Sequence, residues 1–96
     1  MKTELSEREM RGLVLRHRDK YEAAITELYP ESGTVRFSRM EFTEDGQGVP
    51  CFYIAPPKCY LYALPEAEAE EAFDDEEDNA LTFDLADGWK GMVVAL

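Results

Sequence analysis

The first part of the chain carries the hydrophobic period of a helix. Between Met10 and Leu28 the apolar or amphipathic positions recur in steps of three and four, which places them on one side of a helix. Ser6 and Glu9 have the spacing of a capping box, in which each side chain bonds to the backbone N–H of the other residue. We therefore predict one long amphipathic helix over residues 7–28, which ends before the proline that follows.

A strand is predicted next, over residues 34–43. Val35 and Phe37 share one parity along this segment, whereas Met40 and Phe42 share the other. Because side chains alternate between the two faces of a strand, the change of parity indicates a bulge halfway along it. Two closely spaced glycines then predict a turn into the following strand.

Residues 50–64 are the most apolar part of the chain and predict a hairpin around a short proline-containing loop. Pairing Ala55 with Cys59 gives two apolar faces, so we expect a central hairpin with the helix on one face and a packing or binding partner on the other. The expected faces hold Phe52, Ile54, Tyr60, Tyr62 and Leu64 on one side and Cys51, Tyr53, Ala55, Leu61 and Ala63 on the other. This pairing separates the two cysteines by more than about 7 Å, so we expect reduced thiols.

The last third of the chain predicts a short helix and two more strands. Pro65 suits the first position of a helix, which we expect to end near Phe73 and to continue as an acidic loop. Residues 80–85 alternate as a strand, residues 87–91 predict a turn, and residues 92–96 predict a final strand.

Together these elements predict one domain, residues 1–96, of the α+β class. The expected architecture is one long N-terminal amphipathic helix on a mainly antiparallel sheet of about five strands, with a short acidic helix and loop between the third and fourth strands. No apolar run approaches the roughly 18 residues of a membrane-spanning helix. The N-terminus lacks the hydrophobic stretch of a secretory signal, so we expect a cytoplasmic protein.

Negative charge gathers in the second half of the chain. The formal net charge is −11: residues 1–40 contribute +1 from eight cations and seven acids, and residues 41–96 contribute −12 from two cations and fourteen acids. The densest part, which we call the acidic stretch, is residues 66–78, where nine of thirteen residues are Asp or Glu and none is Lys or Arg. Such a surface repels nucleic acid and anionic membranes and attracts basic protein surfaces. Charge that serves solubility alone is the alternative.

The acidic stretch predicts a protein that docks on a basic surface of a partner, with nearby aromatic side chains as anchors. The predicted partner-binding residues are Glu66, Glu68, Glu70, Glu71, Phe73, Asp74, Asp75, Glu76, Glu77, Asp78, Tyr60, Tyr62 and Trp89. In size and charge, though in no motif, the chain resembles DNA-mimic proteins of phages and mobile elements, including anti-CRISPR and anti-restriction proteins. The resemblance implies an inhibitor or regulator that occupies the nucleic-acid-binding surface of its partner.

A different class of function stays open beside this one. The chain is also consistent with a structural or interaction module, such as an immunity-type protein, an assembly subunit or a homodimer, that uses an apolar sheet face. Salt separates the two hypotheses, because a charge-driven contact weakens at high ionic strength and an apolar one barely responds.

The residue types argue against an enzyme, a metal site and a cofactor. His17 is the sole histidine and falls on the buried side of the predicted helix, where a hydrogen-bonded core histidine is the simpler interpretation. A zinc site needs four ligands, and His17 with Cys51 and Cys59 provides three. A calcium-binding loop that began at Asp74 would have Leu85 in place of the bidentate glutamate. Acids interspersed among the basic residues of the helix disfavour direct nucleic-acid binding.

Overall fold

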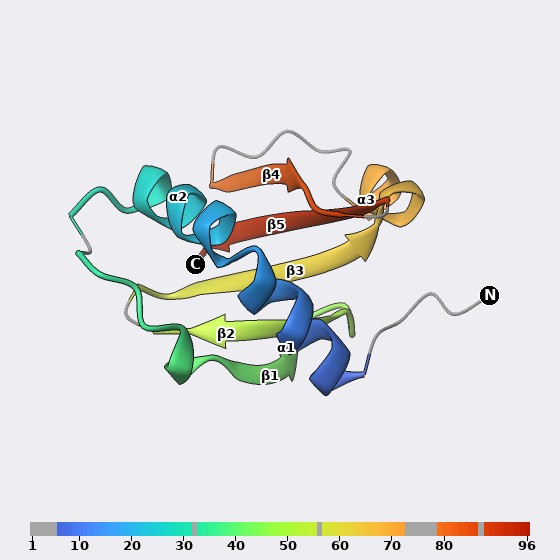
Figure 1. Ribbon diagram of the computed structural model, residues 1–96, viewed down its shortest axis with the longest axis horizontal. Helices are drawn as coiled ribbons and strands as arrows, with labels where there is room; N and C mark the ends of the chain where they lie inside the picture. The colour runs from blue at the N-terminus through green and yellow to red at the C-terminus, as the bar shows by residue number, and fades with distance from the viewer. Residues whose placement is uncertain (1–5, 32, 56, 73–78, 87) are drawn as a thin grey trace.

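The computed structural model describes residues 6–31, 33–55, 57–72, 79–86 and 88–96, and of residues 70–72 only the backbone. In this part of the chain, helices and an antiparallel five-stranded sheet form an α+β fold, as predicted. The strands are β1 (Glu41–Glu44), β2 (Pro50–Ile54), β3 (Cys59–Pro65), β4 (Ala80–Asp84) and β5 (Trp89–Ala95), in the sheet order β1-β2-β3-β5-β4. Helices α1 (Glu7–Arg16) and α2 (Arg18–Leu28) lie over one face, and α3 (Glu66–Ala72) lies at one end (Figure 1). None of the described helices is long and apolar enough to cross a membrane.

The prediction of one long helix is wrong, because the helical segment is divided at His17. The predicted capping box is present at its start, with the Ser6 N–H donating to Glu9 Oε1 (3.1 Å) and the Glu9 N–H donating to Ser6 Oγ (3.2 Å). At His17 the backbone leaves the helical region (φ −115°, ψ 27°), and the ring Nδ1 lies 3.1 Å from the Leu13 carbonyl oxygen. The division lets α1 pack on β3 while α2 packs on β4 and β5 (Figure 1), which one straight helix could not do across a twisted sheet.

The predicted strand over residues 34–43 forms only at its end, and a helical turn precedes it. Phe37–Arg39 form a 3₁₀ turn, η1, and strand β1 starts only at Glu41. Val35 and Met40 are buried on either side of this turn, at 6% and 4% exposed. One helical turn, and not a bulge, therefore accounts for the two parities seen in the sequence.

The hairpin is central in the sheet as predicted, but its register differs from the predicted one by one residue. Cys59 pairs with Ile54 and not with Ala55, which leaves four residues between the paired positions. Because side chains alternate, this shift places Tyr60 and Tyr62 on the opposite face from Ile54. The face under the helices, the inner face, includes Phe52, Ile54, Cys59, Leu61, Ala63, Phe83 and Val93; the other, the outer face, includes Glu41, Cys51, Tyr53, Tyr60, Tyr62, Met92 and Val94.

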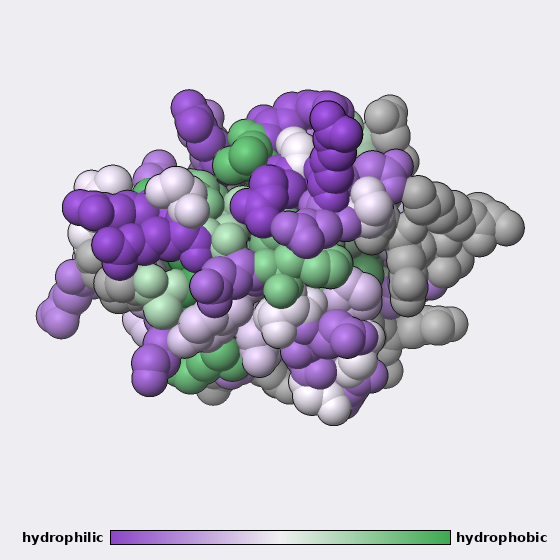
Figure 2. Space-filling model, turned by 90° about the horizontal axis from the view of Figure 1, so that it is seen from below, coloured by the Kyte–Doolittle hydropathy of each residue, from purple (hydrophilic) through white to green (hydrophobic). Residues whose placement is uncertain are grey.

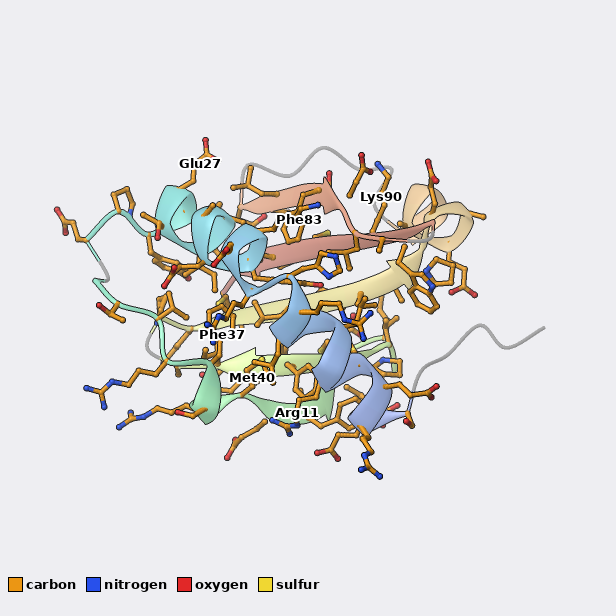
Figure 3. The ribbon with its side chains drawn as sticks, viewed as in Figure 1. Arg11, Glu27, Phe37, Met40, Phe83 and Lys90 are labelled. Atoms are coloured by element: carbon orange, nitrogen blue, oxygen red, sulfur yellow. The ribbon has the colours of Figure 1, made fainter. Side chains whose placement is uncertain are left out.

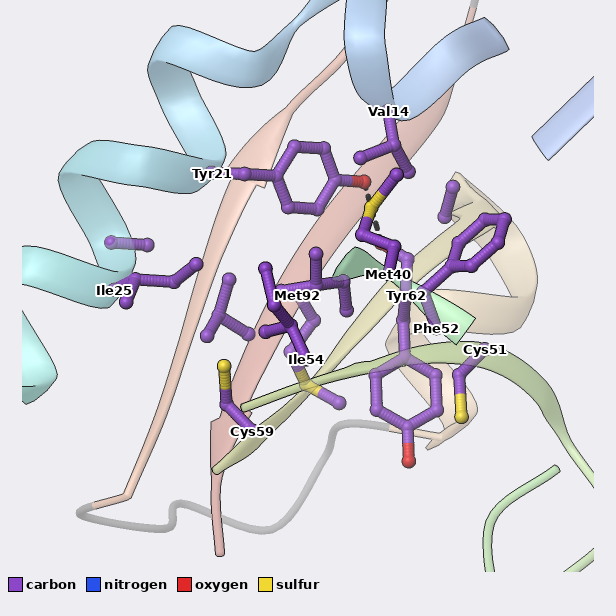
Figure 4. Close-up of a cluster of buried hydrophobic side chains, with 14 of the residues drawn as sticks. Val14, Tyr21, Ile25, Met40, Cys51, Phe52, Ile54, Cys59, Tyr62 and Met92 are labelled. Carbon is purple, nitrogen blue, oxygen red and sulfur yellow. Dashed lines mark hydrogen bonds between the residues drawn. The ribbon is translucent and has the colours of Figure 1, made fainter. Parts of the chain in front are cut away.

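The core lies between α1, α2 and the inner face. Tyr21 of α2 has no exposed surface, and neither do Phe52 and Leu61 of the sheet below it. The Tyr21 hydroxyl donates to the Tyr62 carbonyl oxygen at 2.7 Å, the dashed line in Figure 4. The Tyr21 ring packs edge-on against Phe83, with 4.7 Å between the ring centroids. A polar group from the helix layer is thus satisfied by the central strand of the sheet.

Both cysteines are buried and unbonded, as predicted. Cys51 belongs to the outer face and Cys59 to the inner face, and their thiols point in opposite directions (Figure 4). Burial raises the pKa of each thiol to about 12. The reactive thiolate is therefore scarce at neutral pH.

Strands β4 and β5 match the predicted strands, except that β5 starts at Trp89 and not at residue 92. Gly91, which the sequence places in a turn, pairs inside the sheet with Ala63 and Phe83. A Cβ on Gly91 would lie 2.4 Å from the Phe83 ring and 2.9 Å from the Tyr21 hydroxyl oxygen. This glycine therefore makes room for aromatic side chains and does not mark a turn.

Candidate functional site

The acidic stretch begins on α3, which is held against the end of the sheet. Ala69 is 2% exposed, and the Glu66 N–H donates to the Gly88 carbonyl oxygen at 2.8 Å. Glu66 and Ala67 are exposed, and Glu68 is half-buried. The first turn of α3 therefore presents carboxylates to solvent from a fixed position at one end of the molecule (Figure 1).

The rest of the predicted acidic site lies outside the described residues. This applies to the side chains of Glu70 and Glu71 and to Phe73, Asp74, Asp75, Glu76, Glu77 and Asp78. The chain joins these residues to α3 on one side and to β4 on the other. The part of the predicted site that can be examined is thus Glu66 and Glu68.

The ion pairs within the described ranges include no carboxylate of α3. Arg11 pairs with Glu7 at 3.0 Å, and Lys90 pairs with Asp84 at 3.3 Å. Lys20 donates to the Asp84 backbone carbonyl. The described carboxylates of α3 are therefore not neutralised by cations of the described part of the chain.

Exposed cations gather elsewhere on the molecule. Arg36 and Arg39 are exposed beside η1, at the opposite end of the molecule from α3 (Figure 1). Figure 2, seen from the side of β1, shows hydrophilic side chains over much of that side with separate hydrophobic patches between them. Arg36 and Arg39 therefore lie far from the described carboxylates of α3.

Of the four predicted aromatic anchors, Phe73 lies outside the described residues, and the other three do not share one face of the sheet. Tyr60 and Tyr62 lie on the outer face with ring centroids 6.1 Å apart, whereas Trp89 pairs with Pro65, in register with the inner face. Tyr62 is only 5% exposed and its hydroxyl donates to Asp45 Oδ2 at 2.8 Å, so it is not an exposed anchor. Trp89 is half-buried and lies beside the start of α3, because Pro65 directly precedes that helix.

Asp45 organises the turn between β1 and β2, and the sequence pattern did not single it out. Its Oδ1 accepts from the N–H groups of Gln47 (2.8 Å) and Val49 (2.9 Å). Burial alone would raise the pKa of Asp45, but these bonds and the one from Tyr62 outweigh it and hold the pKa below its ordinary value. The Asp45-Gly46 pair signalled a turn, whereas nothing in the sequence signalled the bond to Tyr62.

Two hollows in the surface differ in the charge of their linings. A hollow of about 600 Å³ lies between the helices and the segment around η1. Its lining residues are Arg11, Leu15, Arg18, Asp19, Glu22, Val35, Phe37 and Ser38. Two cations and two acids favour no ion of either sign. A smaller hollow of about 340 Å³ is lined by Glu41, Phe42, Thr43, Tyr53 and Tyr60, so its lining has a carboxylate and no cation.

Metal and thiol chemistry find little support in the residues that the structure describes. No group of three or more His, Cys, Asp or Glu among them could hold a metal ion. His17 is half-buried at the junction of α1 and α2, where its ring contacts the Leu13 carbonyl. This position gives the histidine a role in ending a helix.

Comparison with known proteins gives no family for the chain. No protein-family model, curated protein or solved structure matches it. Its function is therefore inferred from α3, the acidic stretch and the outer face themselves.

Proposed function

We propose that this protein binds a basic surface of another protein through its acidic stretch and thereby inhibits or regulates that partner. The position of α3 carries the proposal. Ala69 is buried against the sheet, whereas Glu66 is exposed and belongs to neither ion pair found among the described residues. Acids needed for solubility alone would serve equally well if they were scattered over the surface.

A strong excess of charge of one sign favours a partner of the opposite sign. Residues 41–96 carry −12, and complementary charge raises association rates by roughly 10- to 1,000-fold at low salt. A basic nucleic-acid-binding channel is the best matched surface, because carboxylates can take the places of phosphates there. In that form the protein acts as a DNA mimic, in keeping with its resemblance in size and charge to phage anti-defence proteins.

The outer face favours a second candidate, an interaction module that does not use the acidic stretch. Tyr53, Tyr60 and Val94 are half-buried there, so aromatic and aliphatic surface stays accessible. A second copy of the chain or an assembly partner would cover this face. Such a contact would respond weakly to salt, because screening acts on charges and not on apolar burial.

Two variants of equal net charge test the proposal. Glu66→Gln with Glu68→Gln removes two carboxylates from α3, and Glu27→Gln with Glu31→Gln removes two from the end of α2 and the residues after it. Each pair removes two negative charges from −11 and leaves −9. Glu27 and Glu31 are exposed, and Glu27 points away from the core (Figure 3). Proteins captured from host lysate at low salt are identified, and each purified pair is measured by calorimetry at about 50 mM and about 200 mM salt.

The proposal expects roughly tenfold weaker binding for the α3 variant and less than about a twofold change for its control. Reversing Glu70, Glu71, Asp74 and Asp75 to Lys should abolish binding while circular dichroism shows an intact fold. Equal losses in the two matched variants, or an affinity that salt does not change, would contradict the proposal and favour the outer-face contact.

A further inference from the structure

We propose that the smaller hollow on the outer face binds the guanidinium group of an arginine from a partner protein. Glu41, Phe42 and Thr43 of β1 line it together with Tyr53 of β2 and Tyr60 of β3. Its volume of about 340 Å³ is enough for one long side chain. The hollow is separate from α3, so the inference does not rest on the acidic stretch.

Two tyrosines form an aromatic wall in this hollow. Tyr53 and Tyr60 are direct cross-strand partners, and their rings lie 6.0 Å apart between centroids at an angle of 67°. Both residues are half-buried, so packing holds each ring while part of it stays accessible. The negative face of an aromatic ring attracts cations, and arginine is the commonest protein cation in such contacts.

Glu41 adds a full negative charge beside that wall. It is the cross-strand partner of Tyr53, which places the two on the same face of the sheet, and it is exposed. Glu41 takes part in neither of the ion pairs found among the described residues, Arg11–Glu7 and Lys90–Asp84. A guanidinium can stack on an aromatic ring while its planar fork donates two parallel hydrogen bonds to a carboxylate, and a lysine ammonium cannot.

The charges around the hollow also favour a cation from outside. Arg39 and Lys58 are the nearest cations along the chain to Glu41 and to Tyr60, and neither lines the hollow. A net charge of −11 also disfavours an anionic membrane as the partner. An arginine presented by a protein is therefore the occupant that the chemistry fits.

The test compares an arginine with its neutral analogue. Nα-acetyl-arginine methylamide and the citrulline derivative, which is nearly the same shape without the charge, are titrated into the isotope-labelled protein at constant ionic strength. The arginine derivative should shift the ring resonances of Tyr53 and Tyr60 saturably, with about fivefold tighter binding than the citrulline derivative. The lysine derivative and choline should bind more weakly than arginine.

Matched carboxylates on one strand provide the control. Glu41→Gln should weaken arginine binding at least about threefold, whereas Glu44→Gln, on the same strand but in register with the inner face, should leave it unchanged. Tyr53→Leu should also weaken it, since it keeps an apolar side chain without the ring. Equal binding of citrulline, no shift with arginine, or equal effects of the two glutamine variants would overturn the inference. Because the probe is a single residue, these results do not depend on whether α3 binds a partner.

Discussion

The inner and outer faces of the sheet differ in how far their apolar surface is covered. On the inner face Phe52, Leu61 and Val93 have no exposed surface, because α1 and α2 cover them. On the outer face Cys51, Tyr62 and Met92 are buried, at 0%, 5% and 7% exposed, while Tyr53, on the same strand as Cys51, stays half-buried. One face is therefore a packed core, and the other is covered only in part.

The outer face also has a side-chain hydrogen bond of its own. The Tyr62 ring lies on this face, and its hydroxyl donates to Asp45 at the β1–β2 turn. This bond ties the central strand to a turn at the sheet edge. The comparison teaches that two equally apolar strand patterns can serve different purposes, depending on what the rest of the chain places over them.

The largest expected effect is on stability, and it compares the two faces through neighbouring residues of β3, Leu61 on the inner face and Tyr60 on the outer face. Leu61→Ala should cost about 2–5 kcal/mol of stability, because it opens a cavity under the helices. Tyr60→Ala should cost less, about 1–2 kcal/mol, since it removes half-buried aromatic contacts. Urea denaturation of both variants measures the difference. A larger loss for Tyr60→Ala would mean that the outer face is the main core.

A smaller effect is expected for the polar contact of the outer face. Asp45→Asn removes a charge that accepts three hydrogen bonds, so we expect a loss of about 1–3 kcal/mol. Glu44→Gln, one residue earlier, should change the stability by less than about 0.5 kcal/mol. Similar losses for both variants would show that the bonds to Asp45 contribute little.

The hydrogen bonds to Asp45 also predict that the stability of the protein depends on pH. The folded pKa of Asp45 lies below its ordinary value, so its contribution is fully present above the unfolded pKa of about 3.9 and is lost as the pH falls through the folded pKa. Wild-type protein should therefore lose more stability than Asp45→Asn between about pH 5 and pH 2. Parallel curves for the two proteins would contradict this.

The smallest difference between the two faces is expected in the reactivity of their thiols, Cys51 and Cys59. Both have a pKa raised to about 12 by burial, so alkylation at pH 8 should be more than about a hundredfold slower in the folded protein than in urea. Mass spectrometry of timed samples gives both rates. Equal protection of the two thiols would show that the outer face is as closed around Cys51 as the core is around Cys59, and fast labelling of Cys51 alone would show that the outer face opens there.

Signals between residues close along the chain were enough to predict several elements. The Ser6–Glu9 capping box and the strand predicted from residue 80 appear in the structure, and the helix predicted to begin at Pro65 begins one residue later, since Pro65 ends β3. Their partners lie within a few residues, so propensity and spacing contain the needed information. The two free thiols were predicted for a similar reason, although the hairpin register used in that prediction was wrong by one residue.

Contacts between distant parts of the chain determine several features that the hydrophobic pattern of the sequence could not predict. The helix is divided at His17 because its halves pack on different strands of a twisted sheet. Gly91 lies in a strand and not in a turn, and Tyr21 and Phe83 occupy the space that a side chain there would need. Tyr62 was predicted as an anchor, but Asp45 holds its hydroxyl, and that pairing spans 17 residues.

The sequence by itself determined that the charge of this protein gathers in residues 66–78, because composition does not depend on folding. Only the tertiary structure decided how that stretch begins, with Ala69 buried, Glu66 exposed and the Glu66 N–H bonded to Gly88. It also decided that Glu41, Tyr53 and Tyr60 line one hollow. Cross-strand register sets which side chains meet on a face, and register depends on turns and packing that no single segment contains.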